Sequence, residues 1–244
     1  MQQRACPPVE KDISMTRAQG SLFGLCLAAA AMTLAVPAAS EAASISGAGP
    51  LGSFTGTLTY NASSDTQATL NVSLSNTSPT ANGGYLTAFV LNNPGGITGV
   101  ALTSAPNNFW SVLGLTNNGV NAAPYGQFDF GASTGNGFEG GGQPSRGIAT
   151  GASGSFAFSL TGSGLLSLSD TTFLTTLSSG PGIGQGAEDF VARFRGFENG
   201  GSDKVPNTHT PTPPPSPVPE PASMALFGAG LLSLGMVRRQ RRRA

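Results

Sequence analysis

Residues 68–75 read Ala-Thr-Leu-Asn-Val-Ser-Leu-Ser, a strict alternation of apolar and polar side chains. Successive side chains of a β-strand point to opposite faces, so this stretch predicts a strand with one face in a core and the other in solvent. Residues 54–60 alternate similarly, with Phe54, Leu58 and Tyr60 on one face and threonines on the other. Both stretches are predicted to be half-buried strands of one sheet.

Further short apolar stretches follow at similar spacing. Residues 85–91 are apolar on both faces and predict a central strand. Turn-forming residues at 92–96 and 117–119 separate the stretches. The remaining period-two patterns are Phe128/Phe130, Phe156/Phe158/Leu160 and Phe190/Ala192/Phe194. The pattern predicts an all-β domain, an antiparallel β-sandwich of jelly-roll or immunoglobulin-like topology.

One short helix is predicted at residues 171–177, where Ser169 or Asp170 supplies a capping side chain. The apolar residues that would seal one end of the sandwich are Phe173, Leu174 and Leu177.

The part of the chain available to form this domain is residues 44–206, about one domain of ordinary size. It contains eight carboxylates against three arginines and one lysine, a net charge of −4. Such an acidic surface disfavours nucleic-acid binding, so no nucleic-acid partner is expected. Both cysteines, Cys6 and Cys26, precede the domain, which excludes a disulfide framework and a cysteine-ligated metal within it.

The N-terminal residues have the three parts of a secretory signal peptide. Arg17 precedes an apolar run at residues 22–36, and a small-residue segment follows at 37–43. We expect cleavage after residue 42 or 43 and, as partners, the Sec translocon and signal peptidase. The first fourteen residues fit neither signal nor domain, so residues 1–43 are interpreted as a non-native extension followed by a signal peptide that begins at Met15.

The C-terminal residues combine a spacer, an apolar segment and a basic end. Residues 207–217 form a linker rich in proline and threonine, which resists helix and sheet. Residues 222–237 carry no charge and would form a transmembrane helix of about 24 Å, slightly short of the bilayer's hydrocarbon core of about 30 Å. A cytoplasmic stop follows, because arginines stay on the cytoplasmic side: Arg238, Arg239, Arg241, Arg242 and Arg243.

The motif Val218-Pro219-Glu220-Pro221, the apolar segment and the arginines together resemble the PEP-CTERM sorting signal of Gram-negative bacteria, here over residues 218–244. The resemblance implies recognition by exosortase, a membrane protease that cleaves near the Pro-Glu-Pro motif. It also implies a role beside exopolysaccharide in biofilms. The expected location is export across the inner membrane, transient anchoring there, and then the cell surface or the extracellular space.

Ligand binding by the domain has one candidate set. Arg193 and Arg195 share a strand face and can meet anionic sugars, with Trp110 or Tyr125 as a stacking aromatic. The alternative, which we favour, is that both arginines form surface ion pairs with the carboxylates of residues 188 and 189.

Metal binding and catalysis have weaker signals. Asp129, Glu139 and the glycine-rich residues 131–142 offer oxygen ligands for calcium, but two carboxylates also fit a plain glycine loop, and no metal or cofactor is expected. The only histidine, His209, lies in the linker, so no histidine-dependent mechanism is expected of the domain.

A glycoside hydrolase would need a carboxylate pair, either Asp129 with Glu139 or Glu188 with Asp189. The expected order is therefore a non-catalytic surface or matrix protein, then a carbohydrate-binding module, then a carboxylate-based glycoside hydrolase.

Overall fold

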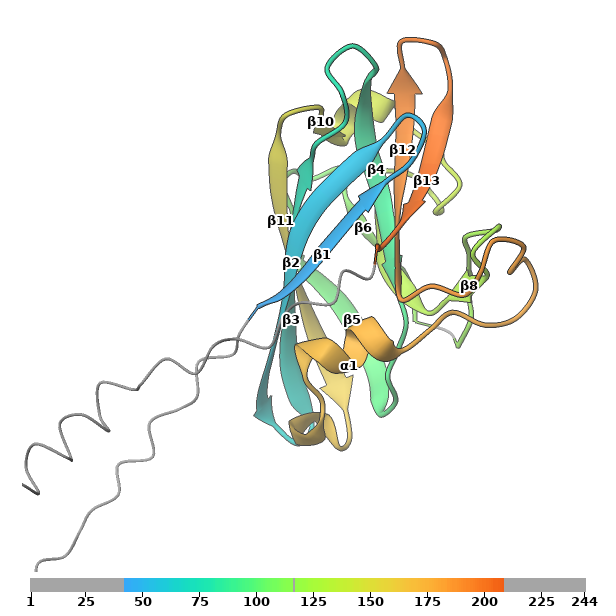
Figure 1. Cartoon of the computed structure of the whole chain (residues 1–244). Helices are drawn as coiled ribbons and strands as arrows, with labels where there is room; N and C mark the ends of the chain where they lie inside the picture. The colour runs from blue at the N-terminus through green and yellow to red at the C-terminus, as the bar shows by residue number, and fades with distance from the viewer. Residues whose placement is uncertain (1–41, 116, 209–244) are drawn as a thin grey trace, which may run out of the picture. The chain divides into compact units, whose positions relative to one another are not determined.

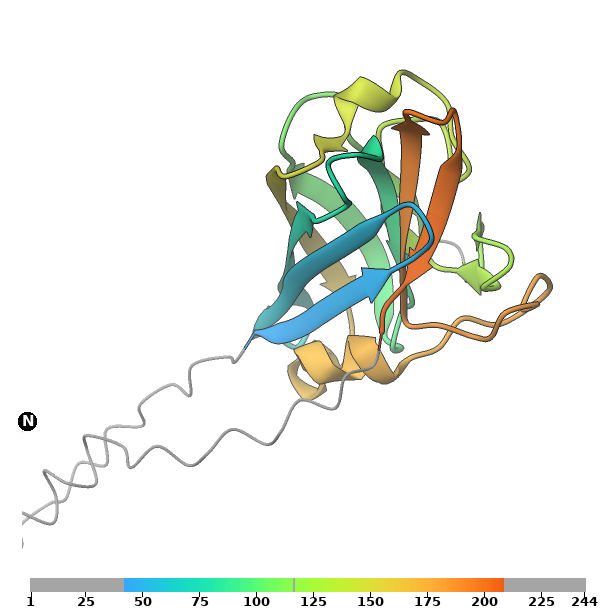
Figure 2. The same ribbon diagram turned by 45° about the horizontal axis from the view of Figure 1, so that its top comes forward.

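A computed structural model describes residues 42–115 and 117–208. These residues form two antiparallel β-sheets around a shared core, which confirms the predicted all-β class (Figures 1 and 2). The predicted signal peptide, the sorting motif, the apolar segment and the arginine cluster lie outside the described residues. Within the described ranges, no helix is long and apolar enough to cross a membrane.

The first sheet, called sheet A, has five strands in the order β1-β2-β3-β11-β5. Its strands are β1 (Ala43–Ala48), β2 (Ser53–Ser64), β3 (Gln67–Asn76), β11 (Ser153–Gly162) and β5 (Ile97–Ser104). The apolar residues of the alternating stretches in β2 and β3 are buried, as predicted, and their threonine and serine neighbours on β3 are exposed or half-buried.

The second sheet, sheet B, has the order β13-β12-β4-β9-β6, and β10 also pairs with β4. Its strands are β13 (Ser202–Pro206), β12 (Phe190–Phe197), β4 (Gly83–Leu91), β9 (Phe130–Ser133), β6 (Ser111–Gly114) and β10 (Ile148–Ala149). The prediction that residues 85–91 form a central strand is confirmed, because β4 lies between β12 and β9.

Shorter elements lie between these strands. They are the two-stranded pair β7 (Val120–Asn121) and β8 (Gln127–Phe128), the 3-10 helices η1 (Pro144–Arg146) and η2 (Leu165–Ser167), and the helix α1 (Asp170–Thr175). The pattern Phe128/Phe130 is divided between β8 and β9 instead of forming one strand, because the chain leaves the β7–β8 pair and enters sheet B at this point.

From β3 to β12 the chain moves repeatedly between the two sheets: β3 is in sheet A, β4 in sheet B, β5 in sheet A, β9 in sheet B, β11 in sheet A and β12 in sheet B. Strands that are distant in sequence therefore become neighbours, as β3 and β11 do.

The core between the sheets is aromatic. Phe89 of β4 has its ring centroid 4.8 Å from that of Phe156, 5.7 Å from Phe190 and 6.0 Å from Phe158. Trp110 contacts the same cluster, with its ring 4.7 Å from Phe156. Stacked and edge-to-face aromatic pairs at these separations add to the free energy gained by burying the rings.

A second core lies on the other face of sheet B. Ala88 and Val90 of β4 and Val191 of β12 point into it, while their chain neighbours point into the first core. Leu113 of β6 joins them, and the residues that cover them are Val120, Ala122, Tyr125, Phe128 and Phe138. The β7–β8 pair and the loops beside it therefore cover this face, which explains why β4 is apolar on both faces.

The predicted helix exists but is shorter than expected. The Ser169 side chain accepts a hydrogen bond from the Thr172 backbone N–H, and Thr172 Oγ1 accepts one from the Ser169 N–H, which together form a capping box. Phe173 is fully buried and closes the end of the sandwich against Tyr60. Leu177 was predicted to join it, but the helix ends at Thr175 and Leu177 is 51 % exposed.

The strands β1 and β13 close one side of the sandwich by contacts between the sheets. Asn207 Oδ1 accepts from the Ser46 N–H at 3.0 Å, and the Ser46 carbonyl accepts from the Thr208 N–H at 2.6 Å. A Cβ at Gly47 would lie 2.2 Å from the Pro206 carbonyl oxygen, so only glycine allows this close approach.

Candidate functional site

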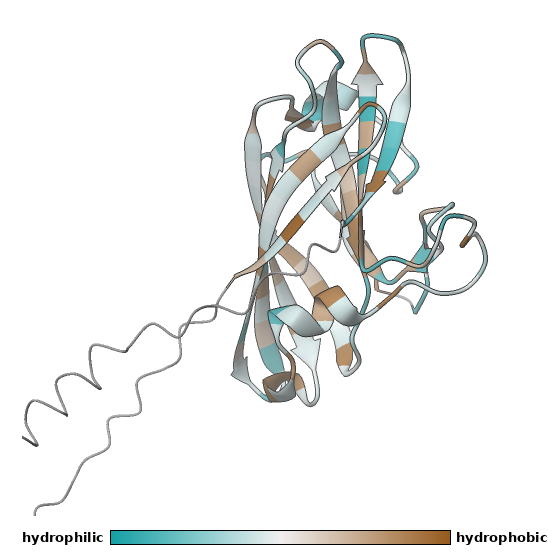
Figure 3. Cartoon of the chain, viewed as in Figure 1, coloured by the Kyte–Doolittle hydropathy of each residue, from teal (hydrophilic) through white to brown (hydrophobic). Residues whose placement is uncertain are grey.

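The two arginines singled out by the sequence lie on the loop-covered face of sheet B. Arg193 and Arg195 alternate on β12 with Ala192 and Phe194, which point into the first core. Figure 3 shows hydrophilic segments on β12 and β13 beside hydrophobic ones. The structure therefore brings the two arginines to one face, as the period of a strand requires.

Each guanidinium donates hydrogen bonds to backbone carbonyls. Arg193 donates to the Asp203 carbonyl at 3.3 Å and to the Glu139 carbonyl at 3.4 Å, and Arg195 donates to the Gly141 carbonyl at 3.1 Å. The glycine-rich loop, considered from the sequence as a calcium loop or a plain glycine loop, thus lies over the arginines. Gly140 has φ +141°, and a Cβ there would lie 3.0 Å from Cζ of Arg195.

Trp110 does not join the arginines. Its ring is 7 % exposed and lies in the core between the sheets, on the opposite face of sheet B from the two guanidinium groups. The aromatic residue that lines the same pocket as Arg193 is Tyr125, the alternative named from the sequence. The sequence gives little basis for choosing between Trp110 and Tyr125. Trp110 precedes a short edge strand and is not part of an alternating apolar and polar pattern that would show which face it occupies.

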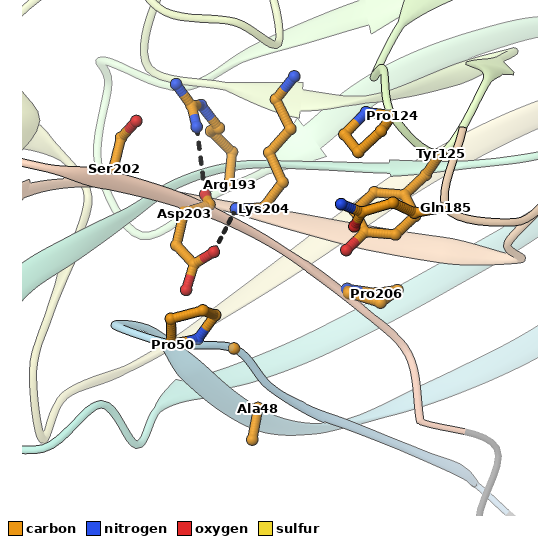
Figure 4. A pocket seen from close by; sticks show the side chains of 11 residues that line it. Ala48, Pro50, Pro124, Tyr125, Gln185, Arg193, Ser202, Asp203, Lys204 and Pro206 are labelled. Carbon is orange, nitrogen blue, oxygen red and sulfur yellow. Dashed lines mark hydrogen bonds between the residues drawn. The ribbon is translucent and has the colours of Figure 1, made fainter. Parts of the chain in front are cut away.

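An open pocket of about 450 Å³ lies at the β13 edge of sheet B (Figure 4). Its polar and charged lining residues are Tyr125, Gln185, Arg193, Ser202, Asp203 and Lys204. Its small and apolar lining residues are Ala48, Gly49, Pro50, Pro124 and Pro206. Segments distant in sequence build it: the β1–β2 turn, the loop around residue 125, the loop that carries Gln185, and the strands β12 and β13.

Asp203 of β13 joins this strand to the β1–β2 turn. Its Oδ2 accepts from the Leu51 N–H at 2.9 Å and from the Gly52 N–H at 3.0 Å, while Oδ1 accepts from the Lys204 N–H (Figure 4 shows the last contact). A carboxylate that accepts several backbone N–H bonds is held in a fixed orientation. The sequence gives no local signal for Asp203, because its partners are about 150 residues away in the chain.

The two basic side chains of the pocket, Lys204 and Arg193, already form some contacts within the domain. Lys204 Nζ contacts Glu139 Oε1 as an ion pair and donates to the Ala123 carbonyl. Burial lowers the pKa of Arg193, and the neighbouring Arg195 adds to this effect, whereas Glu139 and Asp203 oppose it. Arg193 Nε is buried without a hydrogen-bond partner in the described structure. A buried donor of this kind favours an acceptor brought by a ligand or by water.

Tyr125 adds an aromatic ring with a phenolic hydroxyl. Burial raises the pKa of Tyr125, and the charges of Glu188 and Asp203 raise it further. The phenol is therefore neutral over the physiological range and can act as a hydrogen-bond donor or acceptor at the pocket.

The residues considered for calcium have other partners. Asp129 is buried, and its two carboxylate oxygens accept from the backbone N–H groups of Asn93 at 2.7 Å and Asn118 at 2.6 Å. Glu139 pairs with Lys204. Among residues 42–115 and 117–208, no group of three or more histidine, cysteine, aspartate or glutamate side chains could hold a metal ion.

The pairs considered for glycoside hydrolysis are not gathered in the pocket. Asp189 is fully buried, and its Oδ2 accepts from Asn207 Nδ2 at 3.0 Å. Asp203 is the carboxylate among the pocket's lining residues, and it holds backbone N–H groups. What the arrangement offers is a cation, an aromatic hydroxyl and flat proline surfaces.

Comparison with known proteins gives one match. Residues 217–243 match the family model of the PEP-CTERM protein-sorting motif. No curated protein and no solved structure matches the chain. The matched residues contain the Pro-Glu-Pro sequence, the apolar segment and the five arginines from which the resemblance was drawn. The chain therefore carries a PEP-CTERM sorting motif, and this motif identifies it as an exported protein addressed to exosortase.

Proposed function

We propose that the protein is a non-catalytic cell-surface or extracellular-matrix protein, processed by exosortase and associated with exopolysaccharide. The observation that carries this proposal is the sorting motif at residues 217–243, which follows the β-domain described up to residue 208. Signal peptidase removes the residues up to 42 or 43 after Sec-dependent export. Residues 222–237 then anchor the chain transiently in the inner membrane, with the terminal arginines in the cytoplasm.

Exosortase reads the residues at the outer end of this anchor. Pro219 and Pro221 keep the backbone extended and prevent the helix from continuing outward, which suits entry into a protease cleft. Glu220 places one negative charge between them. Cleavage near these residues separates the β-domain from the anchor.

The test is processing in the native host. We expect Glu220→Ala and a variant truncated after residue 217 to lose normal processing and localisation, measured by fractionation and immunoblotting. Glu220→Ala should accumulate as a longer form in the inner membrane. Ser216→Ala, immediately before the matched residues, is the control and should be processed like the parent chain. Parent-like processing of Glu220→Ala would overturn the proposed route.

The proposal that the protein is non-catalytic is supported by the hydrogen bonds and the ion pair that its carboxylates form. Asp129 and Asp203 accept backbone hydrogen bonds, and Glu139 forms an ion pair with Lys204. A glycoside hydrolase needs one carboxyl group as an acid and a second as a base or nucleophile on either side of the substrate. Hydrolysis of the host's exopolysaccharide that disappears in Glu139→Gln would contradict this assignment.

A second candidate is a carbohydrate-binding module, and the pocket at the β13 edge favours it. Arg193 can meet a carboxylate or sulfate group of an acidic polysaccharide, while Tyr125 and the prolines offer surfaces against which a sugar ring packs.

Retention on the immobilised host polysaccharide tests this candidate. Arg193→Gln should weaken retention about tenfold, the effect of losing one charge-assisted hydrogen bond. Arg195→Gln removes the same charge from the same strand face, but Arg195 does not line the pocket. Equal retention of both variants would reject the pocket as the binding site.

A further inference from the structure

Four Asn-Gly dipeptides lie among the residues that the structure describes, at residues 82–83, 118–119, 136–137 and 199–200. In such a pair the backbone nitrogen of the glycine can attack the side-chain carbonyl carbon (Cγ) of the asparagine, because glycine has no Cβ to block the approach and its backbone rotates freely. Asparagine is accordingly one of the labile residue types in proteins. The dipeptide is identical in all four places, so the folded structure decides which of them can react.

The Asn82-Gly83 pair is held by hydrogen bonds on both reacting groups. Asn82 Nδ2 donates to the Leu51 carbonyl at 3.0 Å, and the Gly83 N–H donates to the Thr80 carbonyl at 3.2 Å. For the glycine nitrogen to reach Cγ, the side-chain amide must turn and the nitrogen must leave its acceptor. Both hydrogen bonds would therefore have to break before the reaction.

The Asn199-Gly200 pair is held in the same way, although both residues are exposed. The Gly200 N–H donates to the Phe197 carbonyl at 2.8 Å, and Asn199 Oδ1 accepts from the Gly201 N–H at 2.8 Å. These bonds close the turn that follows β12 and occupy the attacking nitrogen and the side-chain amide together. Exposure to solvent is therefore not sufficient for reaction.

The Asn118-Gly119 pair is fixed through Asn118. The Asn118 N–H donates to the buried Asp129 carboxylate at 2.6 Å, and Asn118 Oδ1 accepts from Ser179 Oγ at 2.9 Å. The backbone of Asn118 has φ 54°, in the left-handed region that few non-glycine residues adopt. Rotation of its amide toward the Gly119 nitrogen would break the contact with Ser179.

The Asn136-Gly137 pair, in the glycine-rich loop, has none of these restraints. Asn136 is exposed, and neither its side chain nor the Gly137 N–H forms a hydrogen bond with any other described residue. The space around Gly137 is open, because a Cβ built there would meet nothing within 4 Å. The flanking backbone is nevertheless held in place, since Ser133 Oγ accepts from the Gly135 N–H and donates to the Gly137 carbonyl, both at 3.0 Å.

We propose that Asn136 deamidates spontaneously in the folded protein and is the preferred site of this modification among the four pairs. The Gly137 nitrogen forms a bond to Cγ of Asn136, and the side-chain amide leaves as ammonia with the proton that this nitrogen gives up. Water then opens the resulting five-membered imide ring at either carbonyl, which gives aspartate or isoaspartate. Water is the only co-reactant, and the inference does not depend on the proposed function.

The modification adds a carboxylate to the loop that lies over the arginines of β12. Asn136 N lies 3.2 Å from the position that a Cβ on Gly141 would take, and the Gly141 carbonyl accepts from Arg195. Deamidation changes the net charge over residues 44–206 from −4 to −5. The isoaspartate product also lengthens the backbone of this loop by one CH₂ group.

Peptide mapping of the exported protein tests the proposal. After incubation at mildly alkaline pH, chymotrypsin releases residues 131–138, which lie between Phe130 and Phe138 and contain Asn136. This peptide should gain the mass that replaces NH₂ by OH at least about tenfold faster than peptides with the other three pairs, which must first break hydrogen bonds. A sample digested without incubation gives the baseline. In denaturant all four pairs should react at comparable rates.

Two outcomes of this mapping would overturn the proposal. One is a folded protein in which any other Asn-Gly pair reacts as fast as Asn136. The other is a folded protein in which residues 131–138 keep their mass while the same residues react in denaturant, since the fold would then protect Asn136.

Matched variants test the chemical route. Gly137→Ala places a methyl group beside the attacking nitrogen and should slow the reaction at least about tenfold. The open space and the φ of Gly137, which lies outside the left-handed region, allow alanine without disturbing the fold. Asn136→Gln keeps an amide but would require a larger ring, so its mass should not change. Circular dichroism checks that both variants are folded. An unchanged rate in Gly137→Ala would exclude ring closure through the glycine nitrogen.

Discussion

The outer faces of the two sheets differ although both sheets follow the same period of two. Sheet A presents serine and threonine to solvent, with Ser75 Oγ 2.7 Å from Ser153 Oγ and Ser73 Oγ 3.2 Å from Ser155 Oγ. Sheet B presents Ala88, Val90 and Val191 to a second core that the loops cover. Sheet B is therefore covered on both faces, whereas sheet A has one face in the core and one face in solvent.

This difference explains where the functional groups gather. The loops that cover sheet B bring Tyr125, Glu139 and the glycine-rich segment to Arg193 and Lys204. The exposed face of sheet A holds short hydroxyl side chains that hydrogen-bond across strands. Loops positioned on a rigid sheet commonly carry function, and this domain follows that rule on one sheet only.

The largest effect is expected in the core that both sheets share. Phe89→Ala removes a fully buried ring that contacts four other aromatic rings, so the free energy of unfolding should fall by about 3–5 kcal/mol. Denaturant unfolding measures this change. Phe109→Ala, at an exposed ring, is the control and should cost less than about 1 kcal/mol. Equal losses would mean that Phe89 is not central to the core.

The next effect separates the loop layer from the sheets. Asp129→Ala removes the acceptor of the Asn93 and Asn118 N–H groups and should lower stability by about 1–3 kcal/mol. Hydrogen exchange should speed up in residues 117–126 and stay slow in β3 and β11. Uniformly faster exchange in both regions would show instead that the loop layer and the sheets unfold together.

A smaller effect depends on pH. The pKa of Tyr125 is raised in the folded state, so the unfolded chain loses this proton first as pH rises. The raised pKa stabilises the folded state fully at pH values below the ordinary tyrosine pKa of about 10. This stabilisation is lost as the pH rises from that value through the higher folded-state pKa. Unfolding free energies measured from pH 8 upward should therefore fall less steeply for Tyr125→Phe than for the parent chain. Parallel curves would contradict the raised pKa.

The smallest effect is expected on the solvent face of sheet A. Ser155→Ala removes an exposed hydroxyl pair with Ser73 and should change the free energy of unfolding by less than about 0.5 kcal/mol. Ser178→Ala is the informative comparison on the loop side. Ser178 is buried, and its Oγ donates to the Tyr125 carbonyl and accepts from the Glu188 N–H, so its loss should cost more.

Several features of the candidate site were beyond prediction because they depend on contacts between distant residues. The sequence placed Arg193 and Arg195 on one strand face, which follows from the local period. The carbonyl that accepts from Arg195 belongs to Gly141, 54 residues away in the chain. Two arginines on one strand do not indicate which distant carbonyl groups will accept their hydrogen bonds. Trp110 was expected at a ligand surface, but packing against Phe156 places it in the core.

The sequence by itself determined the strand pattern of residues 54–74, the all-β class and the sorting motif at residues 217–243, because each is encoded locally by alternation or by a short ordered motif. The tertiary structure alone decided which strands became edges, that sheet B carries a second core, and that Asp203, Tyr125 and Arg193 line one pocket. These outcomes depend on how both faces of each strand are covered, and local periodicity carries no information about the segment that covers them.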